Sequence, residues 1–299
     1  MSMFDVGLIG TGAMGTQIAT RIIAAGHRLA VHNRTRANAL AVENAGGQWC
    51  GSARELAGAS RIVISCLRNT FAVEAVYGGS DGLLCGARPG QIFVEHGTFA
   101  PATARDLAAL AREQGAAFLD APVTGGPAGA AQGTLTIMAG GDADAIDQVT
   151  PLLKSFGSRV IRIGGSGAGL ELKLVNQLLV GAHMTAAAEA IRVLDRVGLD
   201  LGLAAEVLLS GWAESTMLRR AFTQLALGAV EHTGATISGM SEVLDLVNRL
   251  RDDARLSGPV LDATTASFRA AVACGAGELD PAALARPDQR NPAAQVGPR

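Results

Sequence analysis

The segment VGLIGTGAMG, residues 6–15, constrains the fold of this chain more than any other part of the sequence. A short apolar run leads into three glycines with the spacing G-x-G-x-x-G, and a helical pattern follows. In this strand–turn–helix setting the first glycine allows a tight turn. The second lets a pyrophosphate approach the backbone, and the third lets the helix pack on the strand. The segment therefore predicts a dinucleotide-binding turn formed by Gly10, Thr11, Gly12, Ala13, Met14 and Gly15.

The first half of the chain alternates short β-branched runs with helical patterns. The expected strands are Val6–Ile9, Leu29–His32, Ile62–Leu67, Ile92–Glu95 and Phe118–Val123, with further edge strands at Leu135–Met138 and Val160–Ile163. Near-continuous apolar strands separated by helices are typical of a parallel sheet covered on both faces. We therefore expect a doubly wound α/β domain of the Rossmann type over residues 1–164.

The texture changes after Gly164. Residues 168–196 contain no proline and are rich in helix formers, so they predict one long helix linking two domains. The pattern stays helical from Asp200 to about Gly275, which predicts an all-α second domain over residues 165–280, with the long helix included. The last segment, 281–299, is rich in Pro, Ala and Arg and has no apolar stripe, so we expect a disordered tail.

Composition excludes several classes of partner. The net charge is −2 and 17% of the residues are charged, so no basic face predicts nucleic acid or membrane binding. The four cysteines and five histidines are scattered without metal-ligand spacing, and we expect no metal. The N-terminal segment has no signal-peptide pattern, which favours a cytoplasmic protein with a small-molecule partner.

The segment VHNRTR, residues 31–36, predicts which dinucleotide is bound. An NAD site places an acid about 20 residues after the glycines, where it binds the ribose 2′-hydroxyl. This chain has Asn33 in that place, followed by Arg34, Thr35 and Arg36. Because a guanidinium suits a 2′-phosphate, we expect NADP, with NADPH preferred over NADH. The alternative is that the two arginines only face solvent in a loop and bind no ligand.

Polar and glycine-rich segments follow other strands of the predicted sheet. Ligands of doubly wound sheets lie beyond the carboxyl ends of the strands. Thr124, Gly125 and Gly126 follow one such strand and offer a hydroxyl and close backbone N–H groups to a small carboxylate, although an ordinary loop has the same composition. On the long helix, Lys173, Asn176 and Gln177 share one face. Taken alone, such a lysine more often reaches solvent than takes part in catalysis.

These three motifs together resemble the β-hydroxyacid dehydrogenase family over nearly the full chain, to about Gly275. The residues that carry the resemblance are VGLIGTGAMG, DAPVTGG and GSGAGLELKLVNQ. The resemblance implies that the glycine loop binds NAD or NADP and that Thr124–Gly126 bind the substrate carboxylate. It makes Lys173 the catalytic acid or base, with Asn176 and Gln177 orienting the substrate. It also implies nicotinamide contacts at Leu67 and Thr98 and a homodimer or homotetramer.

The chain departs from the family pattern at several positions. The D-x-S-T stretch reads Glu95-His96-Gly97-Thr98, and the usual Leu-Pro reads Leu67-Arg68. Glu242 stands where members place an active-site lysine. We hypothesise that Arg68 and His96 offset the charge of Glu242, with all three facing solvent as the alternative.

The sequence thus predicts an NADP-dependent oxidoreductase that transfers a hydride between the cofactor and a small β-hydroxy acid or its semialdehyde. Two alternatives stay open. One is an imine reductase of the same fold, a class that generally lacks the helix lysine. The other is a catalytically silent NADP-binding module, against which the presence of Lys173 and Asn176 argues.

Overall fold

The chain divides into two compact units, Met1–Leu174 and Val175–Arg299. The computed structural model describes residues 4–226, 228 and 234–286. The predicted domain boundary after Gly164 thus falls earlier than the division of the structure. The reason is that the first turns of the long helix pack with the first unit, where Leu170 is fully buried in the same core as strand residues Val63 and Phe93.

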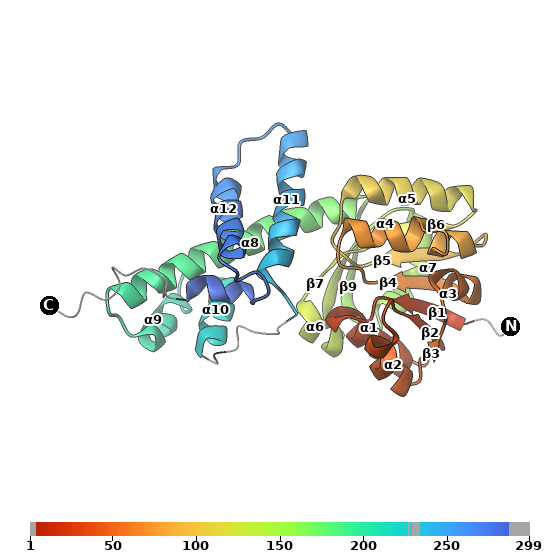
Figure 1. The fold of residues 1–299 in the computed structure, drawn as a ribbon, viewed down its shortest axis with the longest axis horizontal. Helices are drawn as coiled ribbons and strands as arrows, with labels where there is room; N and C mark the ends of the chain where they lie inside the picture. The colour runs from red at the N-terminus through yellow and green to blue at the C-terminus, as the bar shows by residue number, and fades with distance from the viewer. Residues whose placement is uncertain (1–3, 227, 229–233, 287–299) are drawn as a thin grey trace. The chain divides into compact units, whose positions relative to one another are not determined.

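The first unit is built around a nine-stranded sheet (Figure 1). Its strands are β1 (Phe4–Ile9), β2 (Leu29–His32), β3 (Gln48–Trp49), β4 (Ser60–Ser65), β5 (Ile92–Glu95), β6 (Ala117–Asp120), β7 (Val123–Thr124), β8 (Leu135–Gly140) and β9 (Gly157–Gly164). The order is β3-β2-β1-β4-β5-β6-β8-β7, with β9 paired to β8. Strands β1 to β6 are parallel, whereas β8 is antiparallel to β6 and β7. The predicted doubly wound sheet with mixed edge strands is confirmed.

Helices cover both faces of this sheet. They are α1 (Ala13–Ala24), α2 (Leu40–Asn44), α3 (Ala53–Ala59), α4 (Thr70–Gly78), α5 (Pro101–Glu113), α6 (Gly126–Gln132) and α7 (Ala143–Leu153), with short 3-10 helices at Arg36–Ala39 and Leu83–Gly86. Neighbouring residues of one strand enter opposite cores: Ile64 packs with α1 and α7, and Val63 with α3, α4 and α5. Burial on both faces explains why the central strands contain near-continuous apolar runs, such as Ile62–Ile64 in β4.

The predicted set of strands needed two corrections. Strand β3 was not predicted, because its two residues carry no periodic pattern. The expected strand Phe118–Val123 is divided at Pro122 into β6 and β7. Proline has no N–H to donate to a sheet ladder, and the carbonyl of Pro122 accepts from Met138 N at 2.9 Å. The chain therefore leaves β6 there and pairs through β7 with β8 alone.

The secondary structure of the second unit is helical in its described residues, as predicted. The helix expected over 168–196 is α8 (Ala168–Arg196), whose larger part lies in this unit. It is followed by α9 (Leu201–Leu208), α10 (Thr216–Ala226), α11 (Ile237–Asp253) and α12 (Pro259–Ala273). Gly181 of α8 allows close packing, because a Cβ there would lie 3.2 Å from Thr264 of α12 and 3.3 Å from Leu244 of α11.

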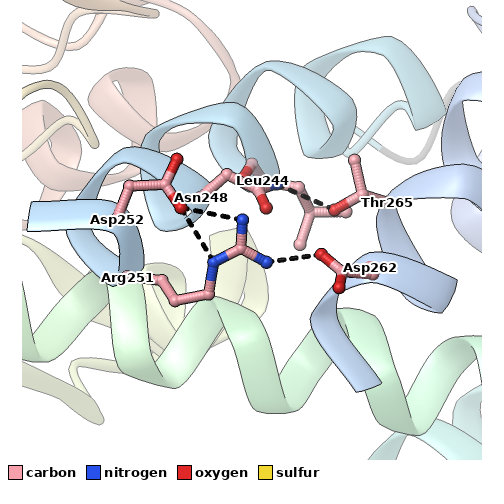
Figure 2. Close-up of polar contacts among 6 residues, drawn as sticks. All are labelled: Leu244, Asn248, Arg251, Asp252, Asp262 and Thr265. Atoms are coloured by element: carbon pink, nitrogen blue, oxygen red, sulfur yellow. Dashed lines mark hydrogen bonds and ion pairs between the residues drawn. The ribbon is translucent and has the colours of Figure 1, made fainter. Parts of the chain in front are cut away.

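Side-chain contacts join α11 to α12 (Figure 2). Asn248 Nδ2 donates to the Leu244 carbonyl at 2.9 Å and to Thr265 Oγ1 at 3.0 Å. Arg251 pairs with Asp252 of its own helix and with Asp262 of α12. Asn248 thus forms hydrogen bonds in the partly buried contact between α11 and α12, while Arg251 forms its ion pairs at the solvent-exposed edge of this contact.

The expectation of a disordered tail from residue 281 is wrong for its first residues. Pro281–Ala285 form a 3-10 helix, η3, in which Pro281, Ala282 and Ala285 are buried. Asp280 caps it by accepting from Ala282 N at 2.9 Å, and its other oxygen pairs with Arg220 of α10. A buried ion pair and cap therefore order a segment whose composition alone suggests disorder. Residues 287–299 lie outside the described residues.

We expect Asp280→Ala to lower the free energy of unfolding by at least about 2 kcal/mol, because it removes a fully buried carboxylate and leaves Arg220 without its partner. Asp262→Ala is the matched control, since it removes an ion pair at an aspartate that is 64% exposed and should cost about 1 kcal/mol or less. Chemical denaturation measures both. Equal losses in the two variants would contradict the structural role of Asp280.

Candidate active site at the carboxyl end of the sheet

The glycine turn between β1 and α1 has the geometry of a dinucleotide site. Gly10 has a φ of +93°, which favours glycine, and a Cβ at Gly15 would lie 1.9 Å from the Gly10 carbonyl oxygen. A Cβ at Gly12 would meet nothing within 4 Å. The first helical turn of α1 has no side-chain cap, and the buried Thr11 Oγ1 has no hydrogen-bond partner. Gly10 and Gly15 are thus required by packing, whereas Gly12, Thr11 and the exposed start of α1 at Ala13 fit a bound phosphate.

Asn33 connects this turn to the loop after β2. Its Oδ1 accepts from Thr11 N at 3.1 Å, and its Nδ2 donates to the Thr35 carbonyl at 2.9 Å. Arg34 is exposed and, within the described part of the chain, forms no ion pair or hydrogen bond. Arg36 is instead engaged, since it pairs with Glu43 and lies 5.2 Å from the centre of the Trp49 ring. The two predicted phosphate-binding arginines therefore differ in their contacts. The guanidinium of Arg36 is already bound, and that of Arg34 is available to a ligand.

Glu95 holds together the loops that follow β4 and β5. Its Oε1 accepts from Leu67 N at 3.0 Å and from Gly97 N at 2.6 Å, while Oε2 is buried without a hydrogen-bond partner. Burial raises the pKa of this carboxyl. A Cβ at Gly97 would lie 2.2 Å from the Leu67 carbonyl oxygen and 2.7 Å from Glu95 Oε1. The Leu67 carbonyl, and after it the Glu95 carboxyl, therefore favours glycine at position 97, and the Glu95 carboxyl binds the amide of that glycine.

The remaining predicted residues of this edge lie on the same loops. Thr98 is half-buried directly after the Glu95-bound amide of Gly97, and Leu67 packs against the core that contains α3 to α5. Met14 packs against the core on the other face. Thr124 ends β7, and Gly125 and Gly126 follow with φ values of +125° and +67°. A Cβ at Gly126 would meet nothing within 4 Å, whereas one at Gly125 would lie 3.0 Å from Leu135 Cδ2, so Gly126, like Gly12, faces open space.

Asp120, at the end of β6, binds the start of the long helix. Its Oδ1 accepts from Gly167 N at 2.7 Å and its Oδ2 from Leu170 N at 3.0 Å. The carboxyl is fully buried, which raises its pKa, and the backbone N–H groups lower it. Asp120 was not among the predicted site residues, although it begins the DAPVTGG motif. Its 47-residue separation from Gly167 leaves no local signal for the contact.

Lys173, Asn176 and Gln177 follow on α8 at helical spacing. Burial lowers the pKa of Lys173 to about 8, although its side chain keeps partial exposure. Asn176 Oδ1 is buried without a hydrogen-bond partner, and Gln177 Nε2 lies 4.0 Å from Met240 Sδ. This helix face thus presents an amine that titrates near neutral pH and, one turn later, an unpaired acceptor.

The hypothesis that His96 offsets the charge of Glu242 is wrong. His96 is 3% exposed, and burial lowers its pKa to about 4, so the ring is neutral at neutral pH. Its Nδ1 contacts the Ala121 carbonyl at 2.6 Å, and the ring packs edge-on against Phe156. A neutral, buried imidazole cannot replace a lysine. Arg68 and Glu242 are both exposed.

Two general features of the described residues bear on the class of protein. They contain no group of three or more His, Cys, Asp and Glu side chains arranged to hold a metal ion. Across the ranges 4–226 and 234–286, no helix is both long and apolar enough to cross a bilayer.

Two family models match the chain. The NAD binding domain of 6-phosphogluconate dehydrogenase matches residues 5–165. The model described as NAD-binding of NADP-dependent 3-hydroxyisobutyrate dehydrogenase matches residues 167–287. Among curated relatives, the NAD-dependent L-serine dehydrogenase of Pseudomonas aeruginosa is 39% identical over 206 residues, 69% of each chain. The 3-hydroxyisobutyrate dehydrogenase of the same organism is 35% identical over 206 residues, 69% of each chain.

Solved structures give the same result. The 3-hydroxyisobutyrate dehydrogenase of Salmonella typhimurium superposes with a TM-score of 0.88 at 29% identity, covering 94% of this chain and 99% of its own. Psf3, solved with NADP+ and 2-OPP, has a TM-score of 0.87 at 30% identity and covers 94% and 98%. An imine reductase from Pseudomonas sp. shares the fold, with a TM-score of 0.63 at 21% identity over 95% of this chain and 98% of its own.

The chain belongs to the β-hydroxyacid dehydrogenase family. This result confirms the family resemblance and the Rossmann-type fold with its helical second part. A nicotinamide dinucleotide is the family's cofactor, and the open Gly12 turn, the unpaired Thr11 hydroxyl and the uncapped start of α1 fit it.

The structure separates the roles of two glycines in this turn. We expect Gly12→Ala to leave the melting temperature nearly unchanged, since its φ of −74° suits alanine and the added methyl meets open space. The same methyl should occupy the phosphate site and raise the Kd for dinucleotide about tenfold or more. Gly15→Ala should instead destabilise the fold. Thermal unfolding and nicotinamide fluorescence titration measure the two effects, and unchanged binding by Gly12→Ala would contradict the assigned site.

Proposed function

We propose that the protein is an NADP-dependent reductase of small β-oxo acids and semialdehydes, acting reversibly on the corresponding β-hydroxy acids. The observation that carries this proposal is that two suitable groups lie one turn apart on α8. Burial lowers the pKa of the Lys173 amine to about 8, and the buried Oδ1 of Asn176 has no hydrogen-bond partner. The bound nicotinamide would supply or accept the hydride. The chain's own residues would then transfer one proton to or from the substrate and bind it.

Lys173 is the proposed acid in reduction. As an ammonium group it would stabilise negative charge on the carbonyl oxygen and donate a proton to it; as an amine it would remove the hydroxyl proton in oxidation. A pKa near 8 suits both directions, because both protonation states are populated close to neutral pH. Asn176 Oδ1 and Gln177 would orient the substrate, with Asn176 accepting a hydrogen bond from its hydroxyl group.

The substrate carboxylate is assigned to the turn Thr124–Gly126. Gly125 and Gly126 both have positive φ, Gly126 faces open space, and the Thr124 hydroxyl adds a donor. Support from relatives comes from the names 3-hydroxyisobutyrate dehydrogenase and L-serine dehydrogenase, both of which denote β-hydroxy acid substrates. The rate of NADPH oxidation with each member of a panel of short carboxylated aldehydes identifies the substrate. Cyclic imines are the contrasting class in this panel.

The cofactor preference rests on the loop after β2. Asn33 removes the acid that an NAD site uses, and the exposed Arg34 has no partner within the described residues, so its guanidinium is available for a 2′-phosphate. Relatives of both kinds exist: one curated relative is named NAD-dependent and one solved neighbour contains NADP+. The loop of this chain therefore carries the argument for NADP.

The predicted homodimer or homotetramer stays a prediction. Helix α9 supports it, since its sequence is LGLAAEVL and none of its residues is buried within the described chain. Leu203 and Val207 are 67% and 69% exposed.

Lys173→Ala should lower kcat by a factor on the order of 10² to 10⁴ while the Kd for NADPH stays within about threefold. In the unchanged protein, kcat for reduction should fall as pH rises through about 8, because the ammonium donor is lost, and kcat for oxidation should rise over the same range. Rates across pH 6 to 10 test both directions, with NADPH oxidation by the aldehyde for reduction and NADP+ reduction by the hydroxy acid for oxidation, and fluorescence titration gives the Kd.

The matched control is Lys154→Ala, which removes the chain's other lysine at an exposed position after α7. It should retain kcat and its pH profile. Retention of most activity by Lys173→Ala would refute its assignment as the acid.

Arg34→Ala should raise the Kd for NADPH about tenfold or more and leave the Kd for NADH nearly unchanged, because only NADPH carries the 2′-phosphate. Arg36→Ala is the control, since that guanidinium is already engaged by Glu43 and Trp49 and its loss should matter less. Fluorescence titration with both cofactors gives the four constants. Equal losses for NADPH and NADH in Arg34→Ala would show that the loop does not read the 2′-phosphate.

A further inference from the structure

The start of α8 carries no capping side chain of its own and uses a residue of the sheet instead. The carboxylate of Asp120 accepts from Gly167 N and Leu170 N, the N–H groups at the first turn of the helix. A carboxylate at a helix start satisfies unpaired donors and interacts favourably with the helix dipole. Because Asp120 ends strand β6, this cap connects α8 to the sheet rather than to its own preceding loop.

The space around the Asp120 carboxylate is closely filled. A Cβ at Gly140 would lie 2.7 Å from both carboxylate oxygens of Asp120. A Cβ at Gly169 would lie 2.3 Å from the Met138 carbonyl oxygen and 3.0 Å from Asp120 Oδ2. Glycine at these two places lets β8 and α8 approach the carboxylate directly. The position of the helix relative to β6 is therefore set within narrow limits.

The same contact relates the two parts of the proposed site within the first unit. Lys173 lies one helical turn after Leu170, whose N–H the carboxylate holds. The turn Thr124–Gly126 begins four residues after Asp120 along the chain. Asp120 is thus bonded to the backbone one turn before Lys173, and it precedes the turn assigned to the substrate carboxylate by four residues, so it fixes the backbone from which each extends.

We propose that Asp120 is a positioning residue, which sets the place of the Lys173 amine relative to the substrate turn by capping α8 from the end of β6. It contacts neither reacting atom and acts through the helix backbone. This inference rests on the proposed role of Lys173. A displacement of about 1 Å at a reacting group costs about 10²-fold in rate, so a loosened cap should be visible in kcat.

Three variants test the proposal in the full-length protein. Asp120→Asn replaces one acceptor oxygen by an N–H₂ group that faces a backbone donor. Asp120→Glu keeps the charge but has no space for the added methylene beside Gly140 and Gly169. Gln91→Ala is the matched control. Gln91 is also buried and donates to two carbonyls, of Ala57 at 2.7 Å and Ser60 at 2.9 Å, but it directly precedes β5 and so lies at the amino end of that strand.

We expect both Asp120 variants to lower kcat about 10- to 100-fold, with the Kd for NADPH within about threefold of the unchanged protein. Gln91→Ala should lower the melting temperature by a similar amount and retain kcat, with all assays run well below the lowest melting temperature. If kcat falls equally in Gln91→Ala, general destabilisation explains the loss and the proposal is wrong. Retention of kcat by both Asp120 variants also overturns it.

A second readout does not require catalysis. The chain has two lysines, so reductive methylation with ¹³C gives separate NMR signals for Lys173 and Lys154, whose titration measures the amine pKa directly. Burial alone lowers the pKa of Lys173, and the nearest charged side chain along α8, Glu171, pairs with Arg105. Release of the helix should admit water and raise this pKa from about 8 toward its ordinary value in Asp120→Asn.

The direction of that change is diagnostic, because loss of the Asp120 charge by itself would lower the pKa of a nearby ammonium group. A fall or an unchanged value in Asp120→Asn overturns the positioning role. If Lys173→Ala proves fully active, the proposed function fails, and the NMR titration still decides whether Asp120 fixes the lysine.

Discussion

Buried carboxylates that accept hydrogen bonds from backbone N–H groups hold the carboxyl end of this sheet together. Loops that leave parallel strands carry donors without strand partners, and an unpaired buried donor costs about 1 to 3 kcal/mol. Glu95 satisfies the amides of Leu67 and Gly97, and Asp120 satisfies those of Gly167 and Leu170. Each acid is fully buried and lies at the end of a neighbouring strand, β5 or β6. The loops that carry the proposed cofactor and substrate contacts therefore have fixed starting points.

Much of the fold could be predicted because its pattern is local. The apolar runs of β2 and β5 and the uninterrupted helix formers of α8 are found at the predicted residues. The failures occur where a distant contact decides the outcome. Pro122 ends β6 because the chain turns to pair with β8, and η3 is ordered by Arg220, sixty residues before Asp280. Periodicity and composition carry no information on such partners.

The candidate site divides in the same way. Gly10, Gly12 and Gly15 could be located from their spacing, because each has a separate steric reason that acts within one turn. The different states of Arg34 and Arg36 could not, since they depend on Glu43 and Trp49, which reach Arg36 from the following helix and strand. The burial of His96 was missed for a related reason. A histidine at the end of a strand can face a core or a ligand, and only the packing of Phe156 from the α7–β9 connection decides between them.

Departures from a family pattern do not by themselves indicate lost function. Glu95 and Gly97 look like two defects in sequence, but the space that a side chain at position 97 would need is taken by the Leu67 carbonyl and the Glu95 carboxyl. The exchange keeps the amides of both loops bonded. Buried polar atoms without partners are rare in folded proteins, and here Thr11 Oγ1 and Asn176 Oδ1 are two of them, at positions assigned to cofactor and substrate. Ser155 Oγ, Thr185 Oγ1 and Gln224 Oε1 are unpaired as well, so an unpaired atom alone does not indicate a ligand site. What distinguishes Thr11 and Asn176 is their position. Thr11 lies beside the open Gly12 at the uncapped start of α1, and Asn176 lies one turn after Lys173 on α8.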